Sequence, residues 1–125
     1  MDTRTKILSP EAAPHACTVV TGVFDPVLAE DARELEEIRA THPDRPLLVV
    51  VLPLPGELLS GRARAELVAA LRMVDYVVIA PDAAKAAATS SLLAALQPAH
   101  LVRMEEAQAI RKKQLMDHVH RRQTI

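Results

Sequence analysis

Four short apolar runs alternate along this chain with segments of helical pattern, and this alternation constrains the fold more than any other feature. The runs read ACTVVTGV, PLLVVVLP, DYVVIA and HLVRM, at residues 16–23, 46–53, 75–80 and 100–104. The second run has no polar residue at alternate positions, which is typical of a strand covered on both faces. Strands separated by helices and short connections predict a parallel sheet with helices on both faces. The sequence therefore predicts a doubly wound α/β domain with about four strands.

Between the runs, apolar residues recur at helical spacing. The first such segment covers residues 28–42, and its apolar positions, three and four residues apart, are Leu28, Ala32, Leu35 and Ile38. Further helices are expected over residues 62–74, 81–98 and 105–122. With 125 residues the chain has the size of one domain. We expect an N-terminal arm over residues 1–15 and one α/β domain, including a C-terminal helix, over residues 16–125.

Composition narrows the classes of partner. A net charge of −1 gives no electrostatic reason to expect nucleic acid or an anionic membrane. The only aromatic side chains of the Phe, Tyr and Trp types are Phe24 and Tyr76, too few for a base-stacking surface. No apolar run approaches the ~18 residues of a membrane span, and no signal peptide is visible. The single cysteine, Cys17, is expected to be buried in a protein of a reducing compartment. These features predict a cytoplasmic protein.

The turn after the first apolar run is the first place to look for a ligand. Ligands of doubly wound sheets lie outside the carboxyl ends of the strands. The stretch reads TGVFDPVLAED, at residues 21–31. It resembles the signature Gly-x-Phe-Asp-x-x-His-x-Gly-His of the nucleotidyltransferase superfamily. Three further stretches, KILSPE, RAELVAALRMVDYVV and LLAALQPAHLV, are similar in order to segments of heptose-phosphate adenylyltransferases and glycerol-phosphate cytidylyltransferases.

This resemblance covers nearly the whole chain and implies a Rossmann-like domain that catalyses adenylyl or cytidylyl transfer, as in bacterial sugar-nucleotide metabolism. A sugar or alcohol phosphate would attack the α-phosphate of a nucleoside triphosphate. In the family, two histidines stabilise phosphate charge near a helix N-terminus. Here the first histidine falls on Leu28, the glycine on Glu30 and the second histidine on Asp31. Leucine donates no hydrogen bond, and a carboxylate a few ångströms from phosphate repels it by about 1 to 4 kcal/mol. The motif is therefore degenerate, and no catalytic residue is predicted.

Candidate residues for binding a nucleotide or sugar phosphate come from the turn, the second helical segment and the last helix. They are Thr21, Gly22, Phe24, Asp25, Arg64, Arg111, Lys112 and Lys113. The last three replace a Ser-Thr-Thr cluster of the family, and a long loop that precedes this cluster in the family is missing here. A bound anion is expected between the turn and these three cations.

Structural interpretations of the same residues stay open. Phe24 is equally well a core aromatic, and Asp25 a carboxylate that ties the turn to backbone amides. The dipole of the first helix accounts for Asp31 in its first turn. Arg64 is equally well a partner of nearby acids. His118 and His120 point about 200° apart on a helix, so they cannot chelate one metal, and no Cys/His spacing suggests zinc. No metal or cofactor is expected, except Mg²⁺ with a nucleoside triphosphate if the protein is active.

Three functional hypotheses follow. The first is a non-catalytic, degenerate nucleotidyltransferase-like domain, a pseudoenzyme that retains nucleotide or phosphate binding, or a role in assembly. The second is an active nucleotidyltransferase whose arginines and lysines clamp phosphate in place of the histidines. The third is a protein-interaction module, dimeric through the last helix. One stripe of that helix, interrupted by Arg111, holds Met104, Ala107, Leu115 and Val119.

Overall fold

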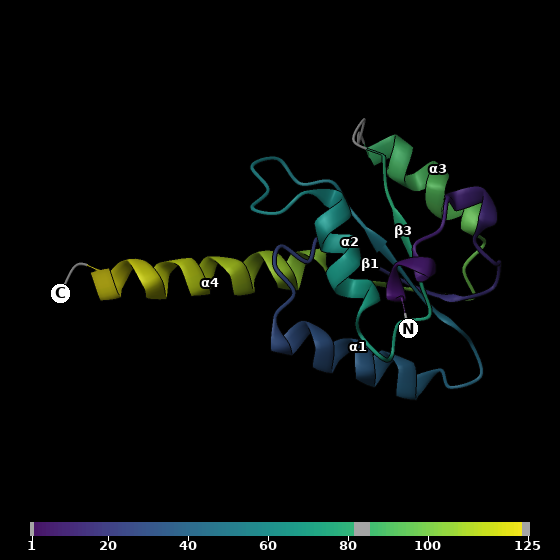
Figure 1. The fold of residues 1–125 in the computed structure, drawn as a ribbon, viewed down its shortest axis with the longest axis horizontal. Helices are drawn as coiled ribbons and strands as arrows, with labels where there is room; N and C mark the ends of the chain where they lie inside the picture. Colours follow the sequence, from purple (N-terminus) through teal and green to yellow (C-terminus); the bar gives the residue numbers. More distant parts are fainter. Residues whose placement is uncertain (1, 82–85, 124–125) are drawn as a thin grey trace.

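All four expected strands form one parallel sheet in the order β3-β2-β1-β4 (Figure 1). The computed structural model describes residues 2–81 and 86–123. The strands are β1 (Thr18–Gly22), β2 (Leu47–Val51), β3 (Tyr76–Ile79) and β4 (His100–Arg103). The helices are α1 (Ala29–Thr41), α2 (Gly61–Ala69), α3 (Ala86–Leu96) and α4 (Glu105–Gln123). The predicted doubly wound α/β fold with a C-terminal helix is confirmed.

The end of the second helix differs most from the sequence-based expectation. The second helix was expected to continue to residue 74 but ends at Ala69. Beyond it, Leu71 N bonds to Val68 O at 3.0 Å and Val74 N to Leu71 O at 3.2 Å, so the chain tightens into turns. The expected start of the third helix falls on residues 82–85, which lie outside the described residues.

Each face of the sheet packs against its own hydrophobic cluster, because successive strand residues point to opposite faces. Strand residues Val20, Leu47, Val49, Val51 and Val77 share one cluster with Leu35 of α1 and Val68 of α2. Strand residues Val19, Leu48, Val50 and Val78 share the other with Leu92, Leu93 and Leu96 of α3. All five residues of β2 are buried, as its unbroken apolar run predicts.

The N-terminal residues lie along the outer edge of β3. They contain two short 3₁₀ helices, η1 (Thr3–Lys6) and η2 (Pro10–Ala12). Between them, Ile7 forms a parallel bridge with Val77, and Leu8 N bonds to Val77 O at 2.8 Å. This segment therefore adds hydrogen bonds to an edge that would otherwise be open.

Helix α4 leaves the sheet at the carboxyl end of β4 and projects beyond the N-terminal end of α1 (Figure 1). Its first turns contact the turn that follows β1, and Met104, just before it, is fully buried. In contrast, residues 113–122 are all exposed. In the described ranges 2–81 and 86–123, no helix has the length and apolar character that a membrane span requires.

Candidate functional site

The turn after β1 is shaped by close packing around Gly22. A Cβ atom at this position would lie 2.5 Å from Phe24 Cε2 and 2.7 Å from Gln108 Oε1. Phe24 is fully buried and has a φ of 51°, a left-handed conformation that costs a non-glycine residue about 1–2 kcal/mol. Gly22 therefore allows the Phe24 ring and a side chain of α4 to approach the strand end.

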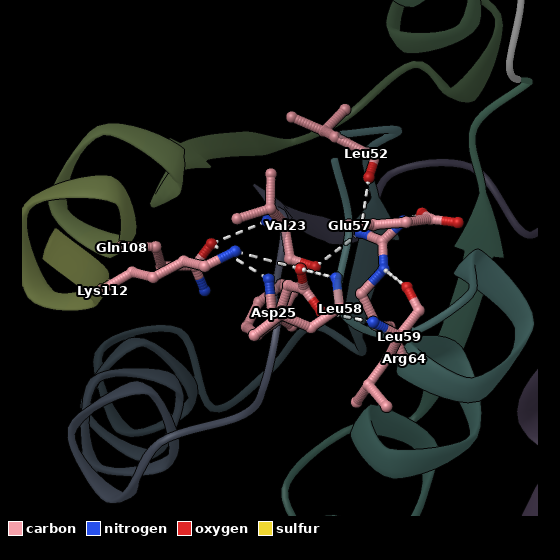
Figure 2. Close-up of polar contacts among 10 residues, drawn as sticks. Val23, Asp25, Leu52, Glu57, Leu58, Leu59, Arg64, Gln108 and Lys112 are labelled. Carbon is pink, nitrogen blue, oxygen red and sulfur yellow. Dashed lines mark hydrogen bonds and ion pairs between the residues drawn. The ribbon is translucent and has the colours of Figure 1, made fainter. Parts of the chain in front are cut away.

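Gln108 of α4 occupies the backbone donors of the turn (Figure 2). Its Oε1 accepts hydrogen bonds from Val23 N at 2.7 Å and from Phe24 N at 3.4 Å. Its Nε2 donates to Asp31 Oδ1 at 3.3 Å, and the residue is 5% exposed. Backbone amides at such a turn are the groups that bind anions in many α/β proteins. Here a neutral side chain of the same protein takes that position.

Asp25 connects the turn to the loop that follows β2. Its carboxylate accepts hydrogen bonds from Leu58 N at 2.7 Å and Leu59 N at 2.9 Å, and from Lys112 Nζ at 3.1 Å (Figure 2). Burial alone raises the pKa of the Asp25 carboxyl. The two backbone hydrogen bonds and the Lys112 ammonium outweigh burial, so the net pKa lies below its usual value. Asp25 is therefore a structural carboxylate that fastens three segments together.

Arg64 of α2 is 1% exposed, and its guanidinium makes four hydrogen bonds within the chain. Nη1 donates to Val23 O at 2.7 Å and to Leu52 O at 2.8 Å. Nε donates to Leu59 O at 3.1 Å, and Nη2 pairs with Glu57 Oε2 at 2.7 Å. Figure 2 shows these bonds converging from the loops after β1 and β2. Arg64 thus holds the two loops that flank the strand ends.

Asp31, which the resemblance aligns with the second histidine of the signature, is 1% exposed and joins α1 to α4. Its Oδ2 accepts from Leu28 N at 2.9 Å, which satisfies one donor at the start of α1. Its Oδ1 accepts from Arg111 Nη2 at 2.6 Å. Burial lowers the pKa of the Arg111 guanidinium, but its hydrogen bond to Asp31 and the nearby carboxylate charges raise the net pKa.

Arg111 is also surrounded by the other acids of the first turns of α1. Its Nη2 lies 3.4 Å from Glu34 Oε2, and its Nε lies 3.8 Å from Glu30 Oε2. Glu30 and Asp31, which the resemblance aligns with a glycine and a histidine of the signature, therefore bind a cation of the same chain.

Little space remains between the turn and Asp31. A cavity of about 20 Å³ is lined there by Val23, Asp25, Pro26, Leu28, Asp31, Gln108, Lys112 and Leu115. A water molecule needs about 10–15 Å³ on this measure, whereas ligand pockets typically measure about 300–1,000 Å³. The cavity between the turn, Asp31 and Gln108 therefore has room for one water molecule and not for a nucleotide.

A larger groove, of about 410 Å³, opens on the other side of α4. Val23, Leu54 and Pro55 line it from the loops after β1 and β2. Helix α4 contributes Glu105, Gln108, Ala109, Lys112 and Lys113. Lys113 is exposed there, and among the described residues no ion pair is recorded for it. This groove is the space between the turn and the basic cluster where the sequence predicts an anion.

The structure brings together most of the residues singled out from the sequence. Thr21, Gly22, Phe24, Asp25, Arg64, Arg111 and Lys112 all surround the turn. Lys113 lies apart from them, on the groove beyond α4. No set of three or more metal-binding side chains occurs in the ranges 2–81 and 86–123.

Sequence reasoning missed Gln108 and Glu105. The Glu105 carboxylate accepts a hydrogen bond from the Thr21 hydroxyl, with Oγ1 lying 2.8 Å from Oε1 and 2.7 Å from Oε2. One signal for Gln108 was available, since it stands four residues after Met104 and so lies on the same face of the helix. A polar residue on a face that begins with a buried methionine indicates a buried polar contact.

No protein-family model matches this sequence, and a search of curated proteins finds no match. The resemblance to nucleotidyltransferases therefore depends on the four sequence stretches quoted above and stays a prediction.

Proposed function

We propose that this protein is a non-catalytic, nucleotidyltransferase-like domain in which the residues of the ligand cleft hold α4 in place, and that it acts in assembly through α4. The observation that carries the proposal is the contact of Gln108 and Arg111 with the degenerate motif. Gln108 Oε1 accepts hydrogen bonds from the amides of Val23 and Phe24, and the Arg111 guanidinium donates one to the carboxylate of Asp31.

Nucleotidyl transfer requires donors aimed at the phosphates in a site that can admit them. The turn amides already have an internal acceptor, and the remaining cavity measures about 20 Å³. Admitting a nucleotide would mean moving α4 and separating Asp31 from Arg111. Leaving one member of a buried ion pair without its partner typically costs about 3–5 kcal/mol, and moving Arg111 away would leave the buried Asp31 in that state. This cost favours a closed site.

The alternative of an active enzyme that clamps phosphate with cations has less support. Arg64 is 1% exposed and bonded to backbone carbonyls and Glu57. Arg111 is held by three acids, and Lys112 by Asp25. These cations would have to leave carboxylates of their own chain before reaching a substrate.

The decisive experiment measures pyrophosphate release from each nucleoside triphosphate with a panel of sugar and alcohol phosphates. Calorimetry with ATP and CTP is carried out in parallel. We expect no release above the substrate-only background and no nucleotide binding. Release that needs both substrates, and that falls when Lys112 is changed to alanine, would overturn the proposal. Lys112→Ala is the suitable variant because Lys112 is partly exposed, whereas loss of the buried Arg64 would disturb the fold.

A second candidate function is supported by the groove beside Lys113. It has about 410 Å³ of space, an unpaired lysine within the described residues, and a position outside the carboxyl ends of β1 and β2. A small anion would fit this chemistry. Chemical-shift titration with inorganic phosphate tests it: shifts around Val23 that vanish in Lys113→Gln support the site, and their absence refutes it.

A further inference from the structure

The exposed half of α4 carries apolar side chains that the described chain covers only in part. Leu115, Met116 and Val119 are 42%, 53% and 43% exposed. Leu115 and Val119 stand on the helix face that begins with the buried Met104 and Gln108, because residues 4, 7 and 11 positions apart return to the same side. One face of α4 is therefore buried against the domain in the first turns and exposed to solvent in the later ones.

The projecting part of α4, residues 113–122, gains little stability from its own backbone. Isolated helices shorter than about 12–15 residues are marginal in water, and most helices in proteins are stabilised by packing of an apolar face. Residues 113–122 are exposed throughout and lie beyond the body of the domain (Figure 1). Their exposed apolar side chains indicate a surface that packs against another protein chain.

A groove beside the stripe offers space for a second helix. It has a volume of about 410 Å³ and lies between the start of α1 and the middle of α4. Its lining residues are Leu28, Ala29, Glu30, Arg111, Gln114, Leu115 and His118. Leu115 belongs both to the groove and to the stripe, so the two form one continuous surface.

The charges along this surface are complementary within one chain. Between residues 113 and 123 there are three cations, Lys113, Arg121 and Arg122, and one acid, Asp117. On α1, Glu30, Glu34 and Glu37 are spaced four and three residues apart and so share one side of the helix. The first of them lines the groove, and its side chain is 60% exposed. A basic helix end and a row of acids on α1 are thus both present on every copy. Glu30 and Glu34 lie 3.8 and 3.4 Å from Arg111 of their own chain, so a docked helix end would share them with that arginine.

We propose that a second copy of this chain docks here, so that two α4 helices pack antiparallel about a twofold axis close to Leu115 and Val119. Each α4 then lies in the groove of the other copy, and its Arg122 reaches Glu30 and Glu34 of that copy. Such an isologous contact is self-complementary, as a closed dimer requires. This proposal rests on the proposed function, because it names the partner that α4 binds.

The interface is small. A single pair of helices and their groove bury less than about 1,200 Å² in total, the range of weak and transient complexes. A monomer–dimer equilibrium that changes with protein concentration is therefore expected.

Sedimentation equilibrium of the full chain over a range of concentrations tests the dimer. The double variant Leu115→Gln, Val119→Gln should raise the dissociation constant by about tenfold or more, because central apolar contacts dominate small interfaces. Ile110→Gln is the matched control. Ile110 is 55% exposed on the same helix but lies about 140° and 180° around it from Leu115 and Val119. It should leave the constant unchanged.

Ionic strength and a charge exchange test the electrostatic contacts of the proposed dimer. Raising the salt concentration from about 0.05 M to about 0.5 M should weaken the dimer, since exposed charges are screened. Arg122→Glu should also weaken it, and adding Glu30→Lys to that variant should restore association. Failure of this rescue, with an unchanged circular dichroism spectrum, would overturn the proposed pairing of the helix end with α1.

Other results would refute the dimer through α4. A chain that stays monomeric at every concentration refutes it, and so does a dimer lost in Leu101→Glu but kept in the α4 double variant. Leu101 is 40% exposed on the edge strand β4, so that result would place the contact at the sheet edge. A monomer that binds no nucleotide would leave the non-catalytic proposal standing. A dimer that releases pyrophosphate would refute the non-catalytic proposal alone.

Discussion

The two halves of α4 are both rich in polar residues but lie in different environments. In the first half, Glu105, Gln108, Arg111 and Lys112 each contact the turn after β1 or the start of α1. In the second half, residues 113–122 are exposed. The difference teaches that the helix is fixed at one end by buried polar contacts, which leaves its other end free to project. Substitutions in the two halves should therefore have unequal effects, and the largest are expected around Asp31.

Asp31→Ala should cause the largest loss of stability. The change leaves Arg111 without its closest acid and Leu28 N without its acceptor. Removing one partner of a buried ion pair costs about 3–5 kcal/mol. Urea unfolding followed by circular dichroism measures the free energy. The control Glu30→Gln affects an exposed acid 3.8 Å from the same arginine and should cost less than about 1 kcal/mol. Equal effects of the two variants would contradict the anchoring role of Asp31.

Gln108→Ala should have the next largest effect. It leaves the amides of Val23 and Phe24 without an acceptor, which costs about 1–3 kcal/mol for a buried donor. The same change frees these amides and enlarges the small cavity, so sulfate should protect the variant against thermal unfolding more than it protects the unaltered protein. Gln114→Ala, on the exposed part of the helix, is the control. A variant as stable as the control would show that water replaces the glutamine at no cost.

Asp25→Asn should reveal a pH-dependent contribution to the anchor. The folded-state pKa of Asp25 is depressed, so its stabilising effect is complete above the unfolded value of about 3.9 and is lost as the pH falls through the lower folded value. At neutral pH the variant should be less stable by about 1–2 kcal/mol, since the bond to the Lys112 ammonium is weakened. Urea unfolding at several pH values should show this difference shrinking below about pH 4. A constant difference at all pH values would contradict the assignment.

Val119→Ala should have the smallest effect on the monomer. The side chain is 43% exposed in the projecting half, and surface changes of this kind alter stability by about 0.5 kcal/mol or less. Thermal unfolding at a concentration where the chain is monomeric gives the value. A loss as large as that of Gln108→Ala would show that the projecting half packs against its own domain in solution.

Much of the fold could be predicted, because it follows from contiguous apolar runs. The unbroken run around Val49 predicts a strand with both faces covered, and all of β2 is buried. The ends of helices were harder to predict where hydrogen-bonded turns compete with the helix, as they do after Ala69. For the site, the sequence predicted the location but not the contacts of its residues. Its polar residues were expected around the turn, and most of them lie there, but with other contacts.

Those contacts join residues that are far apart along the chain. Asp25 and Lys112 are separated by 87 positions, Asp31 and Arg111 by 80, and Asp31 and Gln108 by 77. No local pattern links them. His42 and His100, isolated in the sequence, likewise stack with ring centroids 3.8 Å apart. Side-chain pairing at this range depends on how strands and helices are placed in space.

The order of apolar and polar segments by itself determined a parallel sheet with helices on both faces, since apolar strand runs must be buried on both sides. Only the tertiary structure decided what the polar residues around the turn contact. The fold brings α4 across the turn, and there Asp31 meets Arg111 and the turn amides meet Gln108. The physical reason is that a buried charge or amide must find a partner, and its identity depends on which distant segment the fold brings near.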